Sequence, residues 1–142
     1  MDQRVSLITL GVKDLERSLR FYRDGLGFPT TRKSEDGVIF FQLHGTALAL
    51  YPLNELAKDV SEQLSPTRAG FTGIALAHNV KQKEQVDAVL IEAEKAGGKI
   101  EKPAQDTFWG GYGGYFSDPD GYLWEVAYGA FKFNDDDSLK IT

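Results

Sequence analysis

Apolar and polar residues follow the same order twice along the chain. In the first half, residues 5–12 alternate as a strand does, and apolar positions at spacings of three and four then predict an amphipathic helix over 14–26. Asp14 stands at the expected N-cap of this helix. Three strands are predicted after it, at residues 28–32, 38–43 and 46–51.

The second half repeats this order. Residues 71–80 read as a strand, and an apolar stripe predicts a helix over 82–96 that ends at paired glycines. Three further strands are predicted, at residues 99–103, 112–117 and 122–128. The last two strands are expected to form a hairpin, because the residues between them, Asp118-Pro119-Asp120-Gly121, are typical of a tight turn.

The duplication indicates an α+β protein built from two βαβββ modules. We predict a first module at 1–53, a linker with one helical turn at 54–70, a second module at 71–130, and a tail at 131–142 whose end is mobile. A module of about 50 residues buries little surface alone, so the two are expected to pack together as one domain.

Composition and charge exclude several classes of function. The net charge is −5 without a Lys/Arg cluster, which argues against nucleic acid and anionic membranes as partners. The chain has no cysteine, which excludes thiol catalysis, thiolate metal sites and disulfides. No apolar run approaches the roughly 20 residues of a membrane span, and the N-terminus lacks the pattern of a signal peptide. We therefore expect a soluble, cytoplasmic protein.

Glu125 is the residue most suggestive of chemistry. It is the single charge in the strand 122–128, where it shares a face with Leu123 and Ala127. A carboxylate among apolar residues is costly unless it is solvated, paired or bound to a metal. It is therefore either a glutamate at a solvated sheet edge or a functional hydrogen-bond acceptor or base.

Aromatic residues and glycines are concentrated just before this strand. Five glycines occur from Gly110 to Gly121, together with four aromatic residues, Phe108, Trp109, Tyr112 and Tyr115. Aromatic rings stack on planar or cationic groups, and glycines let the backbone approach a ligand. The group is either a ligand-binding wall or an ordinary sheet core or dimer contact.

The duplication, with DLERSLRFYRDGLGF in the first half and YFSDPDGYLWEVAY in the second, resembles the vicinal oxygen chelate superfamily over residues 5–130. This group includes glyoxalase I, extradiol dioxygenases, and fosfomycin- and bleomycin-resistance proteins. The resemblance implies two modules whose curved mixed sheet surrounds a shared concave pocket, and it implies a homodimer.

The resemblance also implies a divalent metal site with four ligand positions, which in this chain are Leu7, Ala49, Ala75 and Glu125. A hard cation needs several oxygen or imidazole donors at about 2.0–2.5 Å, so one carboxylate cannot hold it tightly. A His78–Glu125 pair would require the two residues to share a sheet face, which the strand alternation opposes. No metal or other cofactor is therefore expected.

These observations favour a binding protein of the bleomycin-resistance kind that holds a small, partly aromatic or cationic molecule between the modules. The ligand-contacting residues would be Leu7, Ala49, Ala75, Phe108, Trp109, Tyr112, Tyr115 and Glu125. The alternative is a metal-dependent lyase or isomerase like lactoylglutathione lyase, or a dioxygenase, with a degenerate Ni, Zn, Mn or Fe site centred on Glu125. A metal-free enzyme that uses Glu125 as base also stays open.

Overall fold

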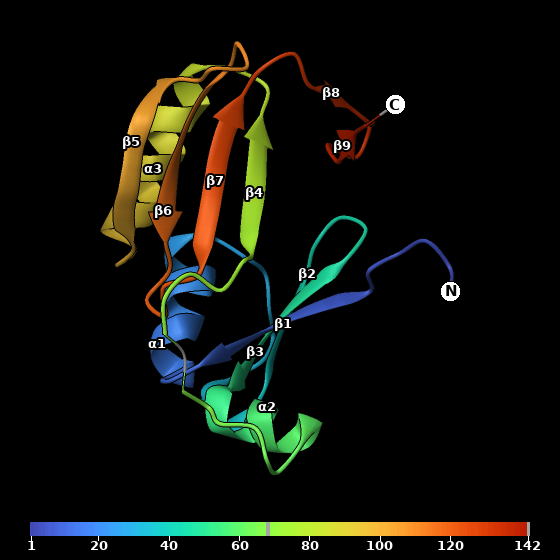
Figure 1. The fold of residues 1–142 in the computed structure, drawn as a ribbon. Helices are drawn as coiled ribbons and strands as arrows, with labels where there is room; N and C mark the ends of the chain where they lie inside the picture. The colour runs from blue at the N-terminus through green and yellow to red at the C-terminus, as the bar shows by residue number, and fades with distance from the viewer. Residues whose placement is uncertain (68, 142) are drawn as a thin grey trace. The chain divides into compact units, whose positions relative to one another are not determined.

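The computed structural model describes residues 1–67 and 69–141, and the chain divides into two compact units, Met1–Thr72 and Gly73–Thr142. Each unit combines helices with a curved, open sheet, which confirms the predicted α+β class (Figure 1). Arg68 and Thr142, in the predicted linker and tail, lie outside the described residues. Of the helices in the described ranges, none has the length and apolar character that a membrane crossing requires.

The sheet of the first unit has three strands in the order β1-β3-β2. β1 (Leu7–Val12) is parallel to β3 (Ala47–Pro52), which is antiparallel to β2 (Ile39–Gln42). Gly45 has φ +78° in the β2–β3 turn and lies beside the exposed His44, which confirms the predicted hairpin. The strand residues that point into the core are buried: Leu10, Val12, Ile39, Phe41, Leu48 and Leu50.

The first helix begins where the sequence predicts it. The carboxylate of Asp14 accepts a hydrogen bond from the backbone N–H of Arg17 at 3.0 Å and so caps α1 (Leu15–Leu19). The helix continues as a π-helix, η1 (Arg20–Gly25). Leu19 and Tyr22 of the predicted apolar stripe are buried. The ring of Tyr22 packs on three other aromatic rings, those of Phe21, Phe28 and Phe41.

The predicted strand at 28–32 is wrong. The backbone of residues 28–33 has no regular structure, and a short 3₁₀ helix, η2 (Ser34–Asp36), follows it. Pro29 removes one backbone donor from a sheet ladder. The segment is held by its side chains, because the ring centroid of Phe28 lies 5.7 Å from that of Tyr22 and 5.8 Å from that of Phe41.

The first part of the predicted linker at 54–70 forms a longer helix than the single turn expected there, α2 (Leu53–Val60). The helix packs over Gly11 at the end of β1. A Cβ atom at Gly11 would lie only 2.6 Å from Cδ1 of Leu53 and 3.3 Å from Cδ2 of Leu56. A glycine at this position therefore lets the helix approach the strand.

The second unit has four strands in the order β4-β7-β6-β5, with α3 (Glu84–Lys95) along one face (Figure 1). β4 (Ala75–Val80) is parallel to β7 (Leu123–Tyr128), just as β1 is parallel to β3. The other strands, β5 (Lys99–Asp106) and β6 (Tyr112–Ser117), are antiparallel to their neighbours. α3 buries Val86, Leu90 and Ala93 of its predicted stripe.

Three predicted boundaries in this unit need correction. β4 begins at Ala75, four residues after the predicted start at Phe71. β5 continues to Asp106, past the predicted end at Pro103, through two shifts of register against β6. The predicted tail contains a hairpin of β8 (Lys132–Phe133) and β9 (Leu139–Lys140). Lys81 contacts this hairpin through an ion pair with Asp137, and its Nζ lies 5.5 Å from the ring centroid of Phe133.

The turn between β6 and β7 is the one predicted from Asp118-Pro119-Asp120-Gly121. Oδ1 of the buried Asp118 accepts hydrogen bonds from the backbone N–H groups of Asp120 and Tyr122, both at 2.9 Å. Gly121 has φ +86°, a conformation that glycine adopts without strain. The turn fixes the register that places Tyr115 opposite Glu125.

Candidate functional site

The register of the second sheet assigns its side chains to two faces. Glu125 pairs with Tyr115 on β6 and with Ala77 on β4, so these three side chains share a face. Their strand neighbours Trp124 and Val126 are buried on the other face, which carries α3. We call the side without α3 the open face; its residues on β4, β6 and β7 are Ala75, Ala77, Asn79, Gly113, Tyr115, Ser117, Leu123, Glu125 and Ala127.

A cavity of about 310 Å³ lies on the open face at Glu125. Tyr115 and Gly113 on β6 line it, and Phe108 and Trp109 come from the β5–β6 loop. The remaining lining residues are Lys102, Gln105, Asp106 and Thr107. The structure therefore brings Glu125 together with three of the four predicted aromatic residues.

Tyr115 and Glu125 interact directly across the β6–β7 ladder. The pKa of Tyr115 lies above its ordinary value, first because burial disfavours the phenolate, and then because of the charge of Glu125 and a side-chain hydrogen bond with it. The phenol is therefore neutral at physiological pH, and the Glu125 carboxylate opposite it can accept a hydrogen bond from its O–H. A carboxylate has several lone pairs, so Glu125 can also accept hydrogen bonds from a ligand.

The raised pKa makes a testable prediction. Tyr115 should ionise above the ordinary tyrosine value of about 10, and Glu125→Gln should lower its pKa without fully restoring it, because burial is the larger cause. The contribution of Tyr115 to the free energy of unfolding is fully present below the pKa of this residue in the unfolded chain. It is lost as the pH rises through the pKa of Tyr115 in the folded protein. Absorbance titration of tyrosinate, with Tyr115→Phe as the reference, measures this. An unchanged titration in Glu125→Gln would contradict the interaction.

The β5–β6 loop holds its aromatic residues by a tight turn. The backbone N–H of Gly111 donates to Oγ1 of Thr107 at 2.8 Å, and the carbonyl of Gly111 accepts from the backbone N–H of Thr107 at 2.9 Å. Gly110 has φ +89°. Phe108 projects from this turn and is fully exposed.

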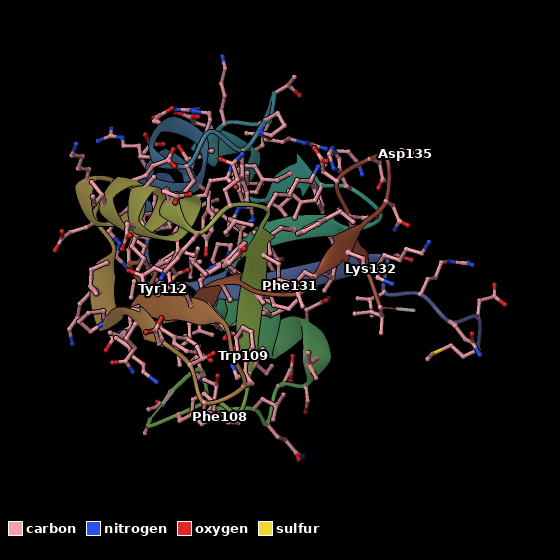
Figure 2. All side chains as sticks on the ribbon, turned by 90° about the horizontal axis from the view of Figure 1, so that it is seen from above. Phe108, Trp109, Tyr112, Phe131, Lys132 and Asp135 are labelled. Carbon is pink, nitrogen blue, oxygen red and sulfur yellow. The ribbon has the colours of Figure 1, made fainter. Side chains whose placement is uncertain are left out.

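Trp109 is folded back on glycines and on the segment after β7. A Cβ atom at Gly111 would lie 2.0 Å from Cζ3 of Trp109, and one at Gly129 would lie 2.7 Å from the same atom. The ring centroid of Phe131 is 5.8 Å from that of Trp109, and Figure 2 shows the two residues near one another. The glycines therefore form a slot that fixes the indole at the cavity.

Tyr112 does not join the other predicted aromatic residues. Its Oη donates to the Asp87 carboxylate on α3 at 2.9 Å, and Nζ of Lys83 lies 4.7 Å from its ring centroid. The hydrogen bond with Asp87 is also the main cause that raises the pKa of Tyr112. Tyr112 therefore lies on the face that carries α3. The sequence alone indicates this separation. Tyr112 and Tyr115 are three residues apart, and strand residues an odd number apart point to opposite faces of the sheet.

The two histidines lie apart from Glu125. His78 pairs with Val126, so it lies on the sheet face opposite Glu125, as the strand alternation indicates. The pKa of His78 is lowered mainly because desolvation disfavours the imidazolium, and Glu92 partly offsets this. His44 is exposed at the β2–β3 turn.

The side chains at the four positions implied for a metal site do not supply the ligands that a divalent ion needs. Ala75 lies on the open face with Glu125. In the first unit, Leu7 and Ala49 share one sheet face, through the pairing of Thr9 with Ala49, and both are aliphatic. Within residues 1–67 and 69–141, no three His, Cys, Asp or Glu side chains are grouped to hold a metal ion. One carboxylate is too few donors for a structural or catalytic divalent site.

Comparison with known proteins identifies the family. A sequence profile of the Glyoxalase/Bleomycin resistance protein/Dioxygenase superfamily matches residues 4–126. Comparison with curated proteins found no match.

Solved structures agree with the profile. A glyoxalase-related enzyme from Fulvimarina pelagi is 35% identical, with 99% of both chains covered and a TM-score of 0.88. A hypothetical protein from S. aureus is 25% identical over 91% of this chain and 95% of that one, with a TM-score of 0.75. Lactoylglutathione lyase from Agrobacterium tumefaciens shares the fold at 24% identity, with 91% and 96% coverage and a TM-score of 0.67. This protein therefore belongs to the glyoxalase/bleomycin resistance protein/dioxygenase superfamily.

Proposed function

We propose that this protein binds a small aromatic cation or hydrogen-bond donor at the cavity on the open face of the second unit. The observation that carries the proposal is the placement of Glu125 in a cavity that Trp109, Tyr115 and the exposed Phe108 also line. A carboxylate next to aromatic rings suits a ligand that has a flat apolar body and a positively charged or N–H-bearing end.

The charges around the cavity support this ligand class. Two carboxylates, Asp106 and Glu125, line it with one ammonium group, that of Lys102. Asp106 has a partner in Lys83, with an N–O distance of 3.8 Å. Glu125 makes no ion pair with a Lys or Arg among the described residues, so its charge is available to a ligand cation. Trp109 is fixed beside it, and a preformed wall reduces the entropy lost on binding.

A comparison of three probes tests the proposal. Benzylammonium should bind the wild-type protein more tightly than the neutral benzyl alcohol or the anionic benzoate at this cavity. Glu125→Gln keeps the size and an acceptor oxygen but removes the charge, so it should weaken benzylammonium binding about tenfold, which corresponds to about 1.4 kcal/mol. Chemical shifts of the Trp109 indole N–H and of β6 and β7 amides report the binding by NMR.

The matched control is Glu84→Gln, which removes the same charge from α3 and should leave binding unchanged. Equal benzylammonium affinity in Glu125→Gln and wild type would reject Glu125 as the recognition group. If none of the three probes shifts the cavity resonances, the proposal of an aromatic ligand site fails.

A catalytic role is the second candidate, and the 35% identity to a glyoxalase-related enzyme favours it. Since the donor set does not suit a divalent ion, the form we propose is metal-free, with Glu125 as the acceptor of a substrate proton. Titration with Ni²⁺, Zn²⁺, Mn²⁺ and Fe²⁺ should give no dissociation constant below about 1 mM. Stoichiometric, micromolar binding would instead favour a metal-dependent lyase, isomerase or dioxygenase.

The homodimer and the cytoplasmic location expected from the sequence belong to this proposal. The dimer is supported by the family resemblance alone. Sedimentation at micromolar concentration should give twice the 15.8 kDa mass of one chain. A particle of one chain only would reject it.

A further inference from the structure

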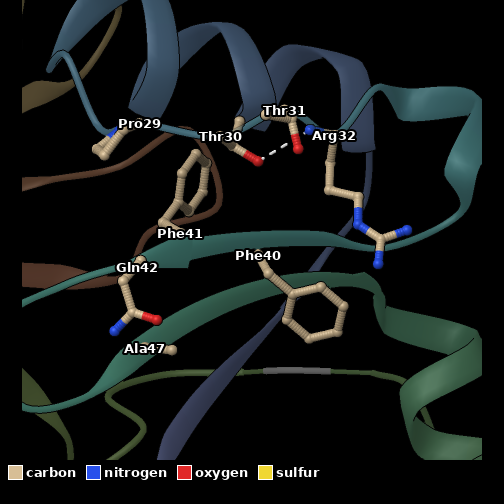
Figure 3. A pocket seen from close by; sticks show the side chains of 8 residues that line it. All are labelled: Pro29, Thr30, Thr31, Arg32, Phe40, Phe41, Gln42 and Ala47. Carbon is tan, nitrogen blue, oxygen red and sulfur yellow. Dashed lines mark hydrogen bonds between the residues drawn. The ribbon is translucent and has the colours of Figure 1, made fainter.

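The first unit has a cavity of its own, of about 490 Å³. It lies between the irregular segment after Gly27 and the β2–β3 hairpin (Figure 3). The lining residues are Pro29, Thr30, Thr31, Arg32, Phe40, Phe41, Gln42 and Ala47. Arg32 is the single charged residue among them, in a protein whose net charge is −5.

The guanidinium of Arg32 is held over an aromatic ring. Its Cζ lies 5.5 Å from the ring centroid of Phe40, and Figure 3 shows the side chain directed toward that ring. A guanidinium above a ring keeps N–H donors that can pair with a carboxylate through two bonds, and the Arg32 side chain is exposed. Among the described residues no Asp or Glu forms an ion pair with Arg32, so the protein itself does not occupy this fork.

Hydrogen bonds organise the segment around Arg32. The backbone N–H of Arg32 donates to Oγ1 of Thr30 at 3.1 Å, which Figure 3 marks by a dashed line. On the hairpin, Nε2 of Gln42 donates to the carbonyl of Leu43 at 3.0 Å and to that of Thr46 at 3.4 Å. Both donors of the Gln42 amide therefore have a partner, so Gln42 offers a ligand its acceptor oxygen and does not compete with Arg32 for an anion.

The rest of the lining is apolar except for Thr31. Phe40 is 39% exposed, an unusual position for a phenylalanine, and Phe41 is buried beside it. Pro29 and Ala47 add aliphatic surface. One guanidinium in an otherwise uncharged lining that includes Phe40 suits a single carboxylate on a flat apolar body better than phosphate, which is more highly charged and needs more donors.

We infer that this cavity binds a small planar carboxylic acid, whose carboxylate pairs with the Arg32 guanidinium while its apolar body lies against Phe40. This site differs from the Glu125 cavity in its unit and in the sign of its charge. The inference does not rest on the function proposed for the second unit, and a failure of either leaves the other unchanged.

Benzoate is the direct probe, and benzamide is its neutral isostere. In NMR titrations at neutral pH and low salt, benzoate should shift the Arg32 side-chain N–H and the β2 amides, and benzamide should bind at least tenfold more weakly. Arg32→Gln should weaken benzoate binding tenfold or more. Arg32→Lys should recover only part of it, because an ammonium lacks the planar fork. Raising the ionic strength should weaken benzoate binding and leave benzamide unaffected.

Matched controls separate the site from general charge effects. Arg17→Gln removes one positive charge from α1 and should leave benzoate binding unchanged. Phe40→Leu should weaken benzoate more than acetate, which lacks the flat body. The inference is overturned if Arg32→Gln binds benzoate as tightly as wild type, or if inorganic phosphate displaces benzoate at equal concentration. It is also overturned if benzoate shifts only residues of the second unit.

Discussion

Tyr22→Ala is expected to lower the free energy of unfolding of the first unit by about 3–5 kcal/mol. Tyr22 is 0% exposed and its ring lies 5.0–5.9 Å from the rings of Phe21, Phe28 and Phe41. Removing the ring leaves a large cavity at the junction of η1, the irregular segment and β2, and the rings around it lose their contacts. Urea unfolding followed by far-UV circular dichroism measures the loss.

Two further variants define what the Tyr22 result means. Tyr22→Phe keeps the ring, so it should retain most of the stability and separate the ring from the hydroxyl. Arg20→Ala, on the exposed side of the same helix, removes a surface ion pair with Glu16 and should leave the urea midpoint close to that of wild type. A loss below about 1 kcal/mol in Tyr22→Ala would mean that this aromatic cluster does not hold the first unit together.

The sequence was sufficient for the elements that local chemistry fixes. The Asp14 cap, the α1 stripe, the Asp118–Gly121 turn and the pairing of β6 with β7 all depend on residues close in sequence. Prediction from the sequence failed where contacts between residues distant in the chain determine the local structure. Residues 28–32 resemble an edge strand, but the packing of Phe28 on Tyr22 holds them outside the sheet. The length of α2 was underestimated because the segment 53–70 as a whole is polar, and the helix is stabilised by contact with Gly11, 42 residues before Leu53.

The candidate site could be predicted only in part. Strand alternation was enough to separate Glu125 from His78, and it would also have separated Tyr115 from Tyr112. Lys102 and Gln105 were missed, because the two register shifts in β5 break the alternation and cannot be seen in the sequence. The Arg32 cavity was missed for a related reason, since it depends on the irregular path of the segment predicted as a strand.

Asp118→Ala is expected to destabilise the second unit by about 3 kcal/mol, because two hydrogen bonds to a charged acceptor are lost at a buried position. Asp118 is 3% exposed, and the backbone N–H groups of Asp120 and Tyr122 would lose their partner. Tryptophan fluorescence in urea reports this unit selectively, since both tryptophans, Trp109 and Trp124, lie in it.

The same turn links stability to the proposed binding site. Asp118 lies one residue after β6, and the tight turn sets the pairing of Tyr115 with Glu125. Asp118→Asn keeps one acceptor oxygen, so it should retain more stability than Asp118→Ala and should leave the Tyr115 titration unchanged. In the folded fraction of Asp118→Ala, loosened pairing should lower the Tyr115 pKa toward its ordinary value, because contact with Glu125 is weakened. If Asp118→Ala is as stable as wild type, the turn is not what holds β6 and β7 in register, and the cavity at Glu125 must be positioned by the loop of Phe108 and Trp109 instead.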